Sequence, residues 1–263
     1  VLLIVIALLL FCSYQNRHLE TTYYTYKAEQ LGADLEGYRI VQISDLHNAK
    51  FGKNNQKLAD RIRECEPDMI VLTGDLVDSN HTNVDRAVQF VNEIVKICPV
   101  YYVTGNHEYW LEASEYDELM SGLTGAGAVI LDDQVVEISR GDAKFRLVGL
   151  DDRSLANGTL EALLSDEKEL TVVLAHEPQY FARYAGTGVD LVLSGHAHGG
   201  QFRLPFVGGI VAPDQGFLPE YTAGEYYMNG TEMIVSRGLG NSVIPMRLFN
   251  YPEIVCVELV GKH

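Results

Sequence analysis

Several short apolar runs along the chain are rich in β-branched residues, and each ends at a polar side chain. The runs cover 39–44, 69–73, 100–104, 171–175 and 191–194. Apolar runs of this length predict buried strands of a parallel sheet. Between and after them, apolar positions at helical spacing predict helices over 54–64, 84–97 and 113–123. Strands that alternate with helices indicate βαβ units and an α/β protein.

The pattern contains more strand than one open sheet would use. Further strands are predicted over 128–131, 134–138, 144–150, 231–236 and 253–259. We therefore expect two packed sheets with helices outside. The length of 263 residues and the 47% hydrophobic content allow one large domain with a sizeable core.

The N-terminus differs from the rest of the chain. Residues 1–12 are apolar, carry no charge and lack an initiator methionine. At about 1.5 Å per residue this run is shorter than the roughly 30 Å hydrocarbon core of a bilayer. We expect residues 1–14 to be the last part of a membrane anchor, with Tyr14 at the interface. A signal-peptide core is the alternative, although no small-x-small cleavage site follows. The side of the membrane is left open.

Residues 15–36 are polar and rich in tyrosine, which predicts a linker that runs into an edge strand. Residues 37–263 then form the main predicted domain. Within it, residues 201–227 are apolar and rich in glycine and proline, as expected of a loop-rich flap. Hairpins that close the second sheet are the favoured interpretation of this flap. A surface that meets a lipid-like substrate is the other.

Composition excludes some functions. The net charge of −16 and the pI near 4.8 argue against nucleic acid as a partner, because nucleic-acid binders usually present a basic face. Bound metal could still draw a phosphate to an acidic protein. The four cysteines, Cys12, Cys65, Cys98 and Cys256, are widely spaced, so neither a disulfide framework nor a zinc-thiolate site is expected.

The polar side chains at the strand ends are the candidate functional residues. Five of the eight histidines lie there, together with carboxylates and an amide: Asp45, His47, Asp75, Asn106, His107, His176, His196 and His198. Ligands of open α/β sheets bind at the carboxyl ends of the strands. Oxygen and imidazole donors without a thiolate suit divalent metals, and Asp75 is the candidate for a bridge between two of them. Alternate residues of an extended segment share a direction, so Asp45 and His47 are expected to reach one target.

The order of these motifs resembles the calcineurin-like metallophosphoesterase superfamily. The motifs are Asp45-x-His47, Gly74-Asp75-x-x-Asp78, Gly105-Asn106-His107-Glu108, His176 and Gly195-His196-x-His198. Glu108 stands where many relatives have aspartate, outside the ligand set. The flap and the segment 236–254 resemble a membrane-associated bacterial branch, some members of which are similar to UDP-2,3-diacylglucosamine pyrophosphatases.

The resemblance implies a four-layer α/β/β/α sandwich of two mixed sheets with a two-metal site at the strand ends. Asp45, His47 and His198 would hold one ion, Asn106, His176 and His196 the other, and Asp75 both. His107 would be the general acid, positioned by Asp78, and metal-bound hydroxide would attack a phosphoester or pyrophosphate bond. The ions could be Mn, Fe, Zn or Mg. A binding scaffold without activity is the second hypothesis, but no ligand of the pattern is missing.

Overall fold

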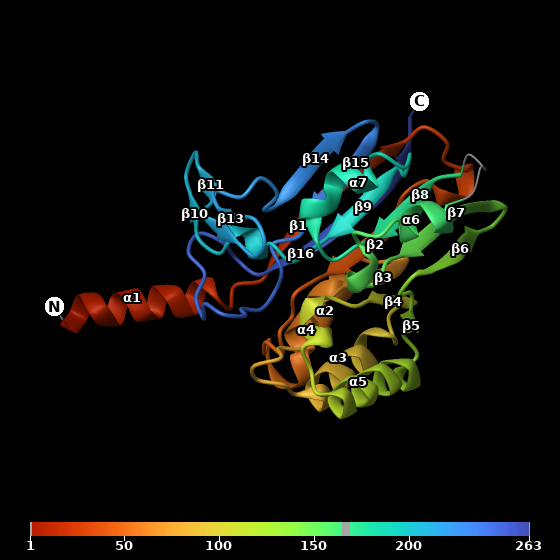
Figure 1. Cartoon of the computed structure of the whole chain (residues 1–263). Helices are drawn as coiled ribbons and strands as arrows, with labels where there is room; N and C mark the ends of the chain where they lie inside the picture. Colours follow the sequence, from red (N-terminus) through yellow and green to blue (C-terminus); the bar gives the residue numbers. More distant parts are fainter. Residues whose placement is uncertain (1, 165–168, 263) are drawn as a thin grey trace.

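Two six-stranded sheets form the centre of the molecule (Figure 1). The computed structural model describes residues 2–164 and 169–262. In spatial order, the first sheet consists of β1 (Glu20–Ala28), β16 (Glu253–Gly261), β2 (Tyr38–Ile43), β3 (Met69–Thr73), β4 (Val100–Val103) and β5 (Val129–Ile130). The second consists of β14 (Gly224–Met228), β15 (Thr231–Val235), β9 (Leu191–Ser194), β8 (Thr171–Leu174), β7 (Ala143–Gly149) and β6 (Gln134–Arg140).

Both sheets are mixed. Strands β2 to β5 run parallel to one another, while β16 pairs antiparallel with β2. In the second sheet β7, β8, β9 and β15 are parallel, and the edge strands β14 and β6 are antiparallel to their neighbours. The predicted excess of strand is therefore explained by a second sheet, and the α/β class is confirmed.

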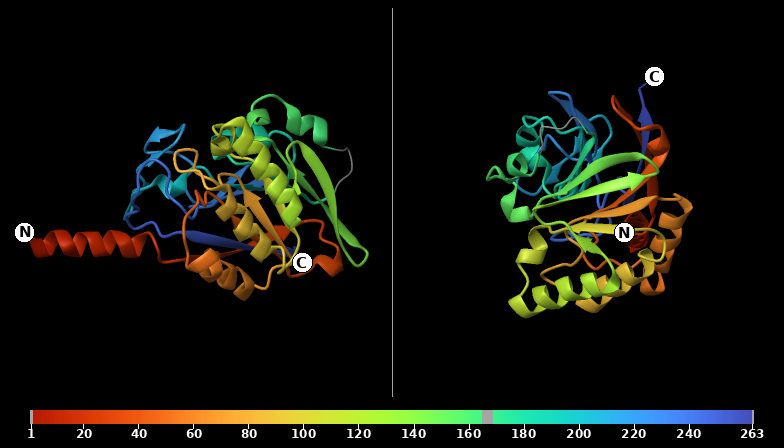
Figure 2. Two further views of the ribbon diagram at one scale, coloured as in Figure 1. Left: turned by 90° about the horizontal axis from the view of Figure 1, so that it is seen from below. Right: turned by 90° about the vertical axis from the view of Figure 1, so that its right-hand side faces the viewer.

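Helices cover the two outer faces, as Figure 2 shows from two directions. The longer ones are α2 (Gln56–Glu64), α3 (Val84–Ile94) and α5 (Ala113–Ala126), and they pack on the outer face of the first sheet. Helices α6 (Thr159–Leu163) and α7 (Phe181–Tyr184) pack on the second sheet. A separate apolar layer, with Ile40 and Val71 facing Leu147 and Val172, fills the space between the sheets. The four-layer α/β/β/α sandwich is thus confirmed.

The helix ends differ slightly from the predicted ones for local reasons. Helix α2 begins at Gln56 because Asn54 and Asn55 adopt left-handed backbone, with φ of 50° and 56°. Helix α3 begins at Val84, as predicted, where the side chain of Asn83 accepts a hydrogen bond from the Arg86 N–H at 2.8 Å and caps the first turn, but it ends at Ile94 rather than at 97. Helix α5 continues to Ala126 and stops at Gly127, where φ is 102°.

The N-terminal helix α1 (Leu2–Gln15) projects from the sandwich (Figure 1). Among the helices of the described residues, none has the length and apolar character that crossing a bilayer requires. Strand β1 follows it and lies at the edge of the first sheet, paired with β16 along its whole length. The division of the chain at residues 14 and 36 stays a prediction.

The flap was predicted to form hairpins that close the second sheet, and this is right only for its last strand. Strand β14 forms the edge of that sheet. The earlier strands, β10 (Arg203–Leu204) with β11 (Gly208–Gly209) and β12 (Val211–Ala212) with β13 (Gly216–Phe217), make two separate hairpins. Each strand has two residues, and Pro205 and Pro213 follow β10 and β12 directly, where they have no N–H to extend the ladder.

Candidate metal centre

The polar residues predicted at the strand ends come together at one edge of the two sheets. Asp45 and His47 follow β2, Asp75 follows β3, and Asn106 and His107 belong to the short helix α4 (Asn106–Tyr109) after β4. His176 follows β8 in the second sheet, and His196 and His198 follow β9. All are buried except Asn106, which is partly exposed. Both sheets therefore supply the site.

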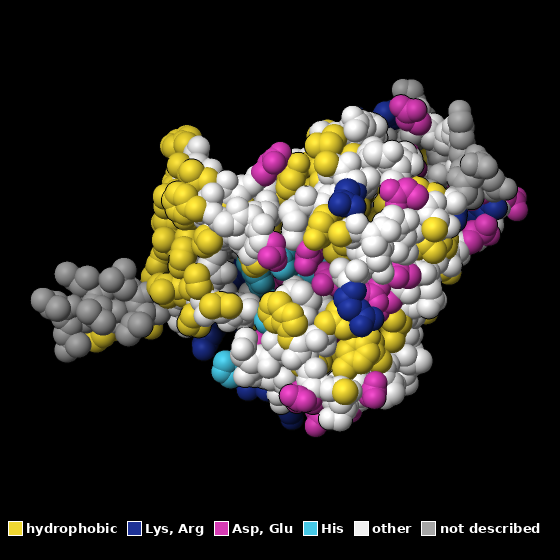
Figure 3. Space-filling model, viewed as in Figure 1, with side chains coloured by type: hydrophobic (Ala, Val, Ile, Leu, Met, Phe, Trp, Pro, Cys, Tyr) yellow, Lys and Arg dark blue, Asp and Glu magenta, His cyan; other side chains and the backbone are white. Residues whose placement is uncertain are grey.

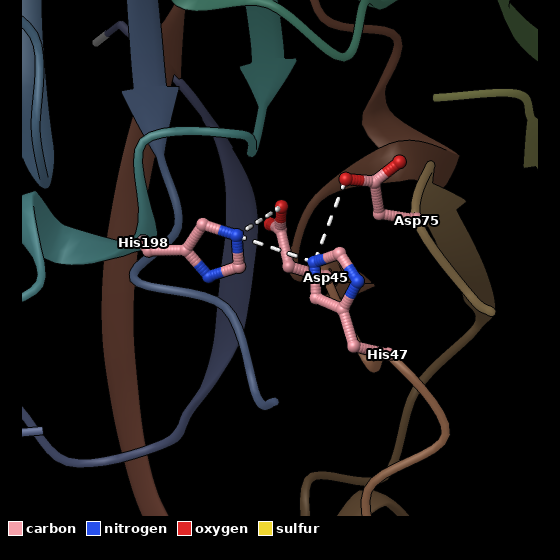
Figure 4. Close-up of side chains that lie close together, drawn as sticks. All are labelled: Asp45, His47, Asp75 and His198. Atoms are coloured by element: carbon pink, nitrogen blue, oxygen red, sulfur yellow. Dashed lines mark hydrogen bonds and ion pairs between the residues drawn. The ribbon is translucent and has the colours of Figure 1, made fainter. Parts of the chain in front are cut away.

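One cluster contains Asp45, His47, Asp75 and His198 (Figure 4). His47 Nε2 lies 3.2 Å from His198 Nε2 and 3.5 Å from Asp75 Oδ2. His198 Nε2 lies 3.7 Å from Asp45 Oδ1. The potential ligand atoms all face one point, which is the arrangement that a metal ion requires.

A second cluster shares Asp75 with the first. The Oδ2 atom of Asp75 lies 3.3 Å from His176 Nε2. This His176 nitrogen is also 3.1 Å from Asn106 Oδ1 and 3.2 Å from His196 Nδ1. His176 Nδ1 is 2.8 Å from the Thr73 carbonyl oxygen, so this nitrogen carries the proton and donates it. The lone pair of Nε2 is thereby directed into the cluster, as expected of a metal-ligating imidazole.

Two glycines allow the ligand loops to approach each other. A Cβ atom at Gly195 would collide with the Ser44 hydroxyl and press on the Asp45 carboxylate. A Cβ atom at Gly105 would collide with Asp75 Oδ1. The space is used for hydrogen bonds, since the His196 N–H donates to Asp45 and the His107 N–H donates to Asp75. These glycines are needed for close contact, which explains the Gly-His and Gly-Asn pairs of the sequence.

The local geometry of Asp45 and His47 corrects one step of the sequence argument. They do not lie on an extended segment, because their φ angles are 49° and 43°. His196 and His198 likewise have φ of 62° and 48°. Tight left-handed turns after β2 and β9, rather than strand alternation, bring each pair to the site. The convergence was predicted correctly, but the reason given for it was wrong.

The electrostatics of the site fit divalent cations. Burial lowers the pKa of His47 to about 3 and lowers the pKa of His198 well below its usual range, so both imidazoles are neutral and can act as ligands. Burial alone would raise the pKa of Asp75, but the imidazoles of His176 and His47 outweigh it and hold the pKa well below its usual value. Burial would lower the pKa of His176, but the Asp75 carboxylate outweighs burial and raises this pKa well above its usual range, so a cation that binds here would displace the proton on Nε2. A buried carboxylate and imidazoles at these distances are a donor set that Mn, Fe, Zn or Mg could satisfy.

His107 lies beside the first cluster, with its ring 4.5 Å from the His47 ring. Its Nδ1 atom accepts a hydrogen bond from the Ser79 N–H at 3.2 Å, so the neutral ring carries its proton on Nε2. Nε2 faces the Ser242 hydroxyl at 3.1 Å. Asp78 Oδ1 is 3.6 Å from Nδ1, within ion-pair range. The roles of His107 as acid and of Asp78 as its positioning partner stay predictions.

Glu108 has a structural function that the sequence did not reveal. Its carboxylate is fully buried and accepts hydrogen bonds from the N–H groups of Asp75 and Leu76, at 2.9 and 2.8 Å, and of Gly105, at 2.7 Å. It therefore joins the loop after β3 to the start of α4. Burial, with the charge of Asp75, raises its pKa to about 8.

Other acidic neighbours also went unpredicted. Asp214, in the turn between β12 and β13, lies 2.9 Å from His196 Nε2. This contact directs His196 Nδ1 towards the second cluster. Glu177, next to His176, groups with the same two side chains. Burial raises the pKa of Asp152 to about 7, against the opposing charge of His176. A hairpin turn and a loop carry no periodic signal, so only the fold reveals these positions.

Comparisons with known proteins agree with this geometry. The calcineurin-like phosphoesterase family matches residues 38–200. The chain is 32% identical over 262 residues to the uncharacterized metallophosphoesterase YkuE of Bacillus subtilis, covering 95% of this chain and 88% of that protein. It is 34% identical to an uncharacterized metallophosphoesterase of Aquifex aeolicus, covering 93% of this chain and 95% of that one.

A third relative carries a more specific name. The chain is 30% identical over 228 residues to the phosphodiesterase YaeI of Escherichia coli, covering 85% of this chain and 82% of that protein. The family match spans more than half of the chain, and the buried carboxylate and histidine clusters are consistent with the two metal ions of the family. The chain therefore belongs to the calcineurin-like phosphoesterase family, and it is a metal-dependent phosphoric ester hydrolase.

Proposed function

We propose that this enzyme hydrolyses a phosphate with two substituents, either a phosphodiester or a pyrophosphate, at two adjacent metal ions. The observation that carries the proposal is the position of Asp75. Its Oδ2 atom lies within 3.5 Å of His47 Nε2 and 3.3 Å of His176 Nε2, so it belongs to both clusters. Asp45, His47 and His198 would hold one ion, and Asn106, His176 and His196 the other.

Two bound ions would supply an activated water and a charge clamp for the phosphoryl oxygens. The chain would supply a proton donor for the leaving oxygen. His107 suits this function because its ring lies beside the first cluster, 4.5 Å from the His47 ring, and its Nε2 atom faces the Ser242 hydroxyl rather than a buried carboxylate. The carboxylate of Asp78, 3.6 Å from Nδ1, would stabilise positive charge on the ring.

The name of the E. coli relative, a phosphodiesterase, supports a substrate with two substituents on phosphorus. A lipid-linked pyrophosphate of the UDP-2,3-diacylglucosamine type is the finer proposal. The apolar hairpins support it because Asp214 in one of them contacts His196. Helix α1, which has no charged residue, supports the further proposal that residues 1–14 anchor a bacterial enzyme to a membrane.

The test is a panel of substrates with each candidate metal. The full chain, loaded with Mn, Fe, Zn or Mg, is assayed on a generic aryl phosphodiester, an aryl phosphomonoester and a UDP-linked diacyl sugar. We expect the diester and the pyrophosphate to be hydrolysed in preference to the monoester. Activity should disappear with a chelator and return with metal. Preferential hydrolysis of the monoester would contradict the proposed substrate class.

A further inference from the structure

Large apolar side chains are exposed together at the end of the molecule that carries the hairpins. They come from the hairpin β10–β11, from β13 and the residue after it, and from the loop between β15 and β16: Leu204, Phe206, Val207, Phe217, Leu218, Val243, Met246 and Phe249. We call this set the apolar face. Figure 3 shows a band of hydrophobic side chains along this end. Phe206 is fully exposed, and Val243 is 85% exposed.

Three residues of the apolar face adopt an energetically unfavourable backbone conformation. Phe206, Leu218 and Phe249 adopt left-handed backbone, with φ of 67°, 52° and 51°. Bulky residues rarely occupy this region, and residues kept there cluster at functional sites. The buried side chain of Arg247 stabilises the loop between β15 and β16, because it donates hydrogen bonds to the carbonyl oxygens of Arg237 and Gly240. Exposure of these side chains is therefore a built feature of the fold.

The apolar face continues into helix α1. The Phe11 and Phe249 rings are in edge contact, with centroids 5.9 Å apart. Asn16 Nδ2 donates to the Pro245 carbonyl oxygen at 2.9 Å, and the Arg247 N–H donates to Asn16 Oδ1 at 2.8 Å. The end of an uncharged, apolar helix is thus attached to the apolar face, which produces one continuous hydrophobic surface.

Cations gather next to the end of this helix, although the chain has a net charge of −16. Arg17, Lys50 and Lys57 line a cavity of about 240 Å³. Lys50 also lines an adjoining cavity of about 380 Å³, together with Lys53 and Arg86. Among the described residues that line the two cavities, Asp85 is the one acid. This charge suits an anionic partner beside the hydrophobic surface.

We propose that the apolar face docks on an anionic lipid bilayer, with its side chains among the acyl chains and the neighbouring cations at the headgroups. An exposed apolar surface beside Lys and Arg is the combination that binds anionic membranes. Docking would bring the catalytic edge to the lipid surface, because Ser242, next to Val243, contacts His107 at 3.1 Å. This inference concerns a surface, and it does not depend on which phosphate compound is hydrolysed.

Tryptophan reporters test the docking in the full chain, separately from any binding by α1. Phe206→Trp and Phe217→Trp each place a fluorophore on the apolar face, and Val129→Trp places one on an exposed position of β5 as the control. Trp110 is common to all three proteins. With vesicles of phosphatidylcholine and phosphatidylglycerol, we expect the emission of the two apolar-face reporters to shift to the blue and to be quenched by brominated lipid. The Val129→Trp protein should show neither change.

The charge is tested in a second arm. Lys53→Gln with Lys57→Gln should weaken binding to anionic vesicles about fivefold for each cation removed, and should not change binding to pure phosphatidylcholine. Lys144→Gln with Lys262→Gln is the matched control. Emission of both apolar-face reporters that stays unshifted while the protein sediments with vesicles would overturn the proposal, since α1 alone would then hold the protein. A shift that occurs without vesicles, on raising the protein concentration, would indicate a protein partner and would also overturn it.

Discussion

Buried polar groups at strand ends and exposed apolar groups on hairpins meet at one end of this enzyme. In the metal centre, every candidate ligand follows a buried strand, and hydrogen bonds join the loops of the two sheets, such as the His196 N–H to Asp45 at 3.0 Å. On the apolar face, the strands are two residues long and the side chains contact solvent. The two regions touch through Asp214 and His196 and through Ser242 and His107.

This difference in burial predicts which substitutions should affect stability and activity. Removing a group from the metal centre leaves buried charges or donors without partners, which is costly. Removing a side chain from the apolar face exposes nothing that was buried, so the protein should still fold and should still hydrolyse soluble substrates. The following predictions test this contrast, from the largest expected effect to the smallest.

The largest effect is expected from Asp75→Asn. Because one carboxylate belongs to both clusters, its loss should strip or displace both metals. The loss of metal stabilisation of the transition state should lower kcat/KM by about a thousandfold or more. Metal content by mass spectrometry and hydrolysis of an aryl phosphodiester are the measurements. Asp60→Asn, on the exposed side of α2, is the control. Full metal content with retained activity would show that Asp75 does not bridge.

His107→Ala should keep the metals and lose rate. Loss of a general acid is expected to lower kcat by about 10²- to 10⁴-fold, and least for substrates with a good leaving group. Metal content and kcat are measured for diesters that differ in the pKa of their leaving group. His18→Ala removes an exposed histidine that belongs to neither cluster, and should have no effect. A His107 variant that loses metal would instead identify this residue as a ligand.

Glu108→Ala should act on stability first. It removes an acceptor shared by the N–H groups of Asp75, Leu76 and Gly105 and leaves these donors buried. The expected loss is about 3 kcal/mol of unfolding free energy, measured by denaturant titration. Glu108→Gln keeps one acceptor oxygen and should lose less. Equal stability of the alanine variant and the parent would refute the idea that Glu108 joins the two loops.

The same contrast separates what the sequence could and could not predict. Asp75 and Asn106 were predictable because they follow neighbouring parallel strands, β3 and β4, whose carboxyl ends meet at one edge of the sheet. The function of Glu108 was not, because its partners in the loop after β3 are backbone groups far from it in the chain. The place of β16, between β1 and β2, is likewise set by long-range pairing that no local pattern records.

For the apolar face, the sequence revealed part of the composition but not the backbone conformation. The composition and the loop-rich character of residues 201–227 were visible in the sequence, but the contribution of Val243, Met246 and Phe249 was not. The backbone of the apolar face was not predictable, because left-handed angles at Phe206 and Leu218 contradict the local preference of both residues. The hairpins, the loop between β15 and β16 and helix α1, which are distant in the sequence, also had to be brought together by the fold before a continuous surface existed. Sequence periodicity describes buried strands well and exposed hairpins poorly, since only burial imposes a period.

The smallest effect is expected from Phe206→Ser combined with Phe217→Ser. Both side chains are exposed, so the unfolding free energy should change by less than about 0.5 kcal/mol. The kcat/KM for a soluble aryl phosphodiester should stay at the parental value. For a lipid-linked pyrophosphate in vesicles it should fall by about tenfold or more, because two apolar contacts with lipid are lost. Val129→Ser is the matched control. If lipid-linked and soluble substrates were turned over at unchanged rates, the apolar face would have no part in substrate access.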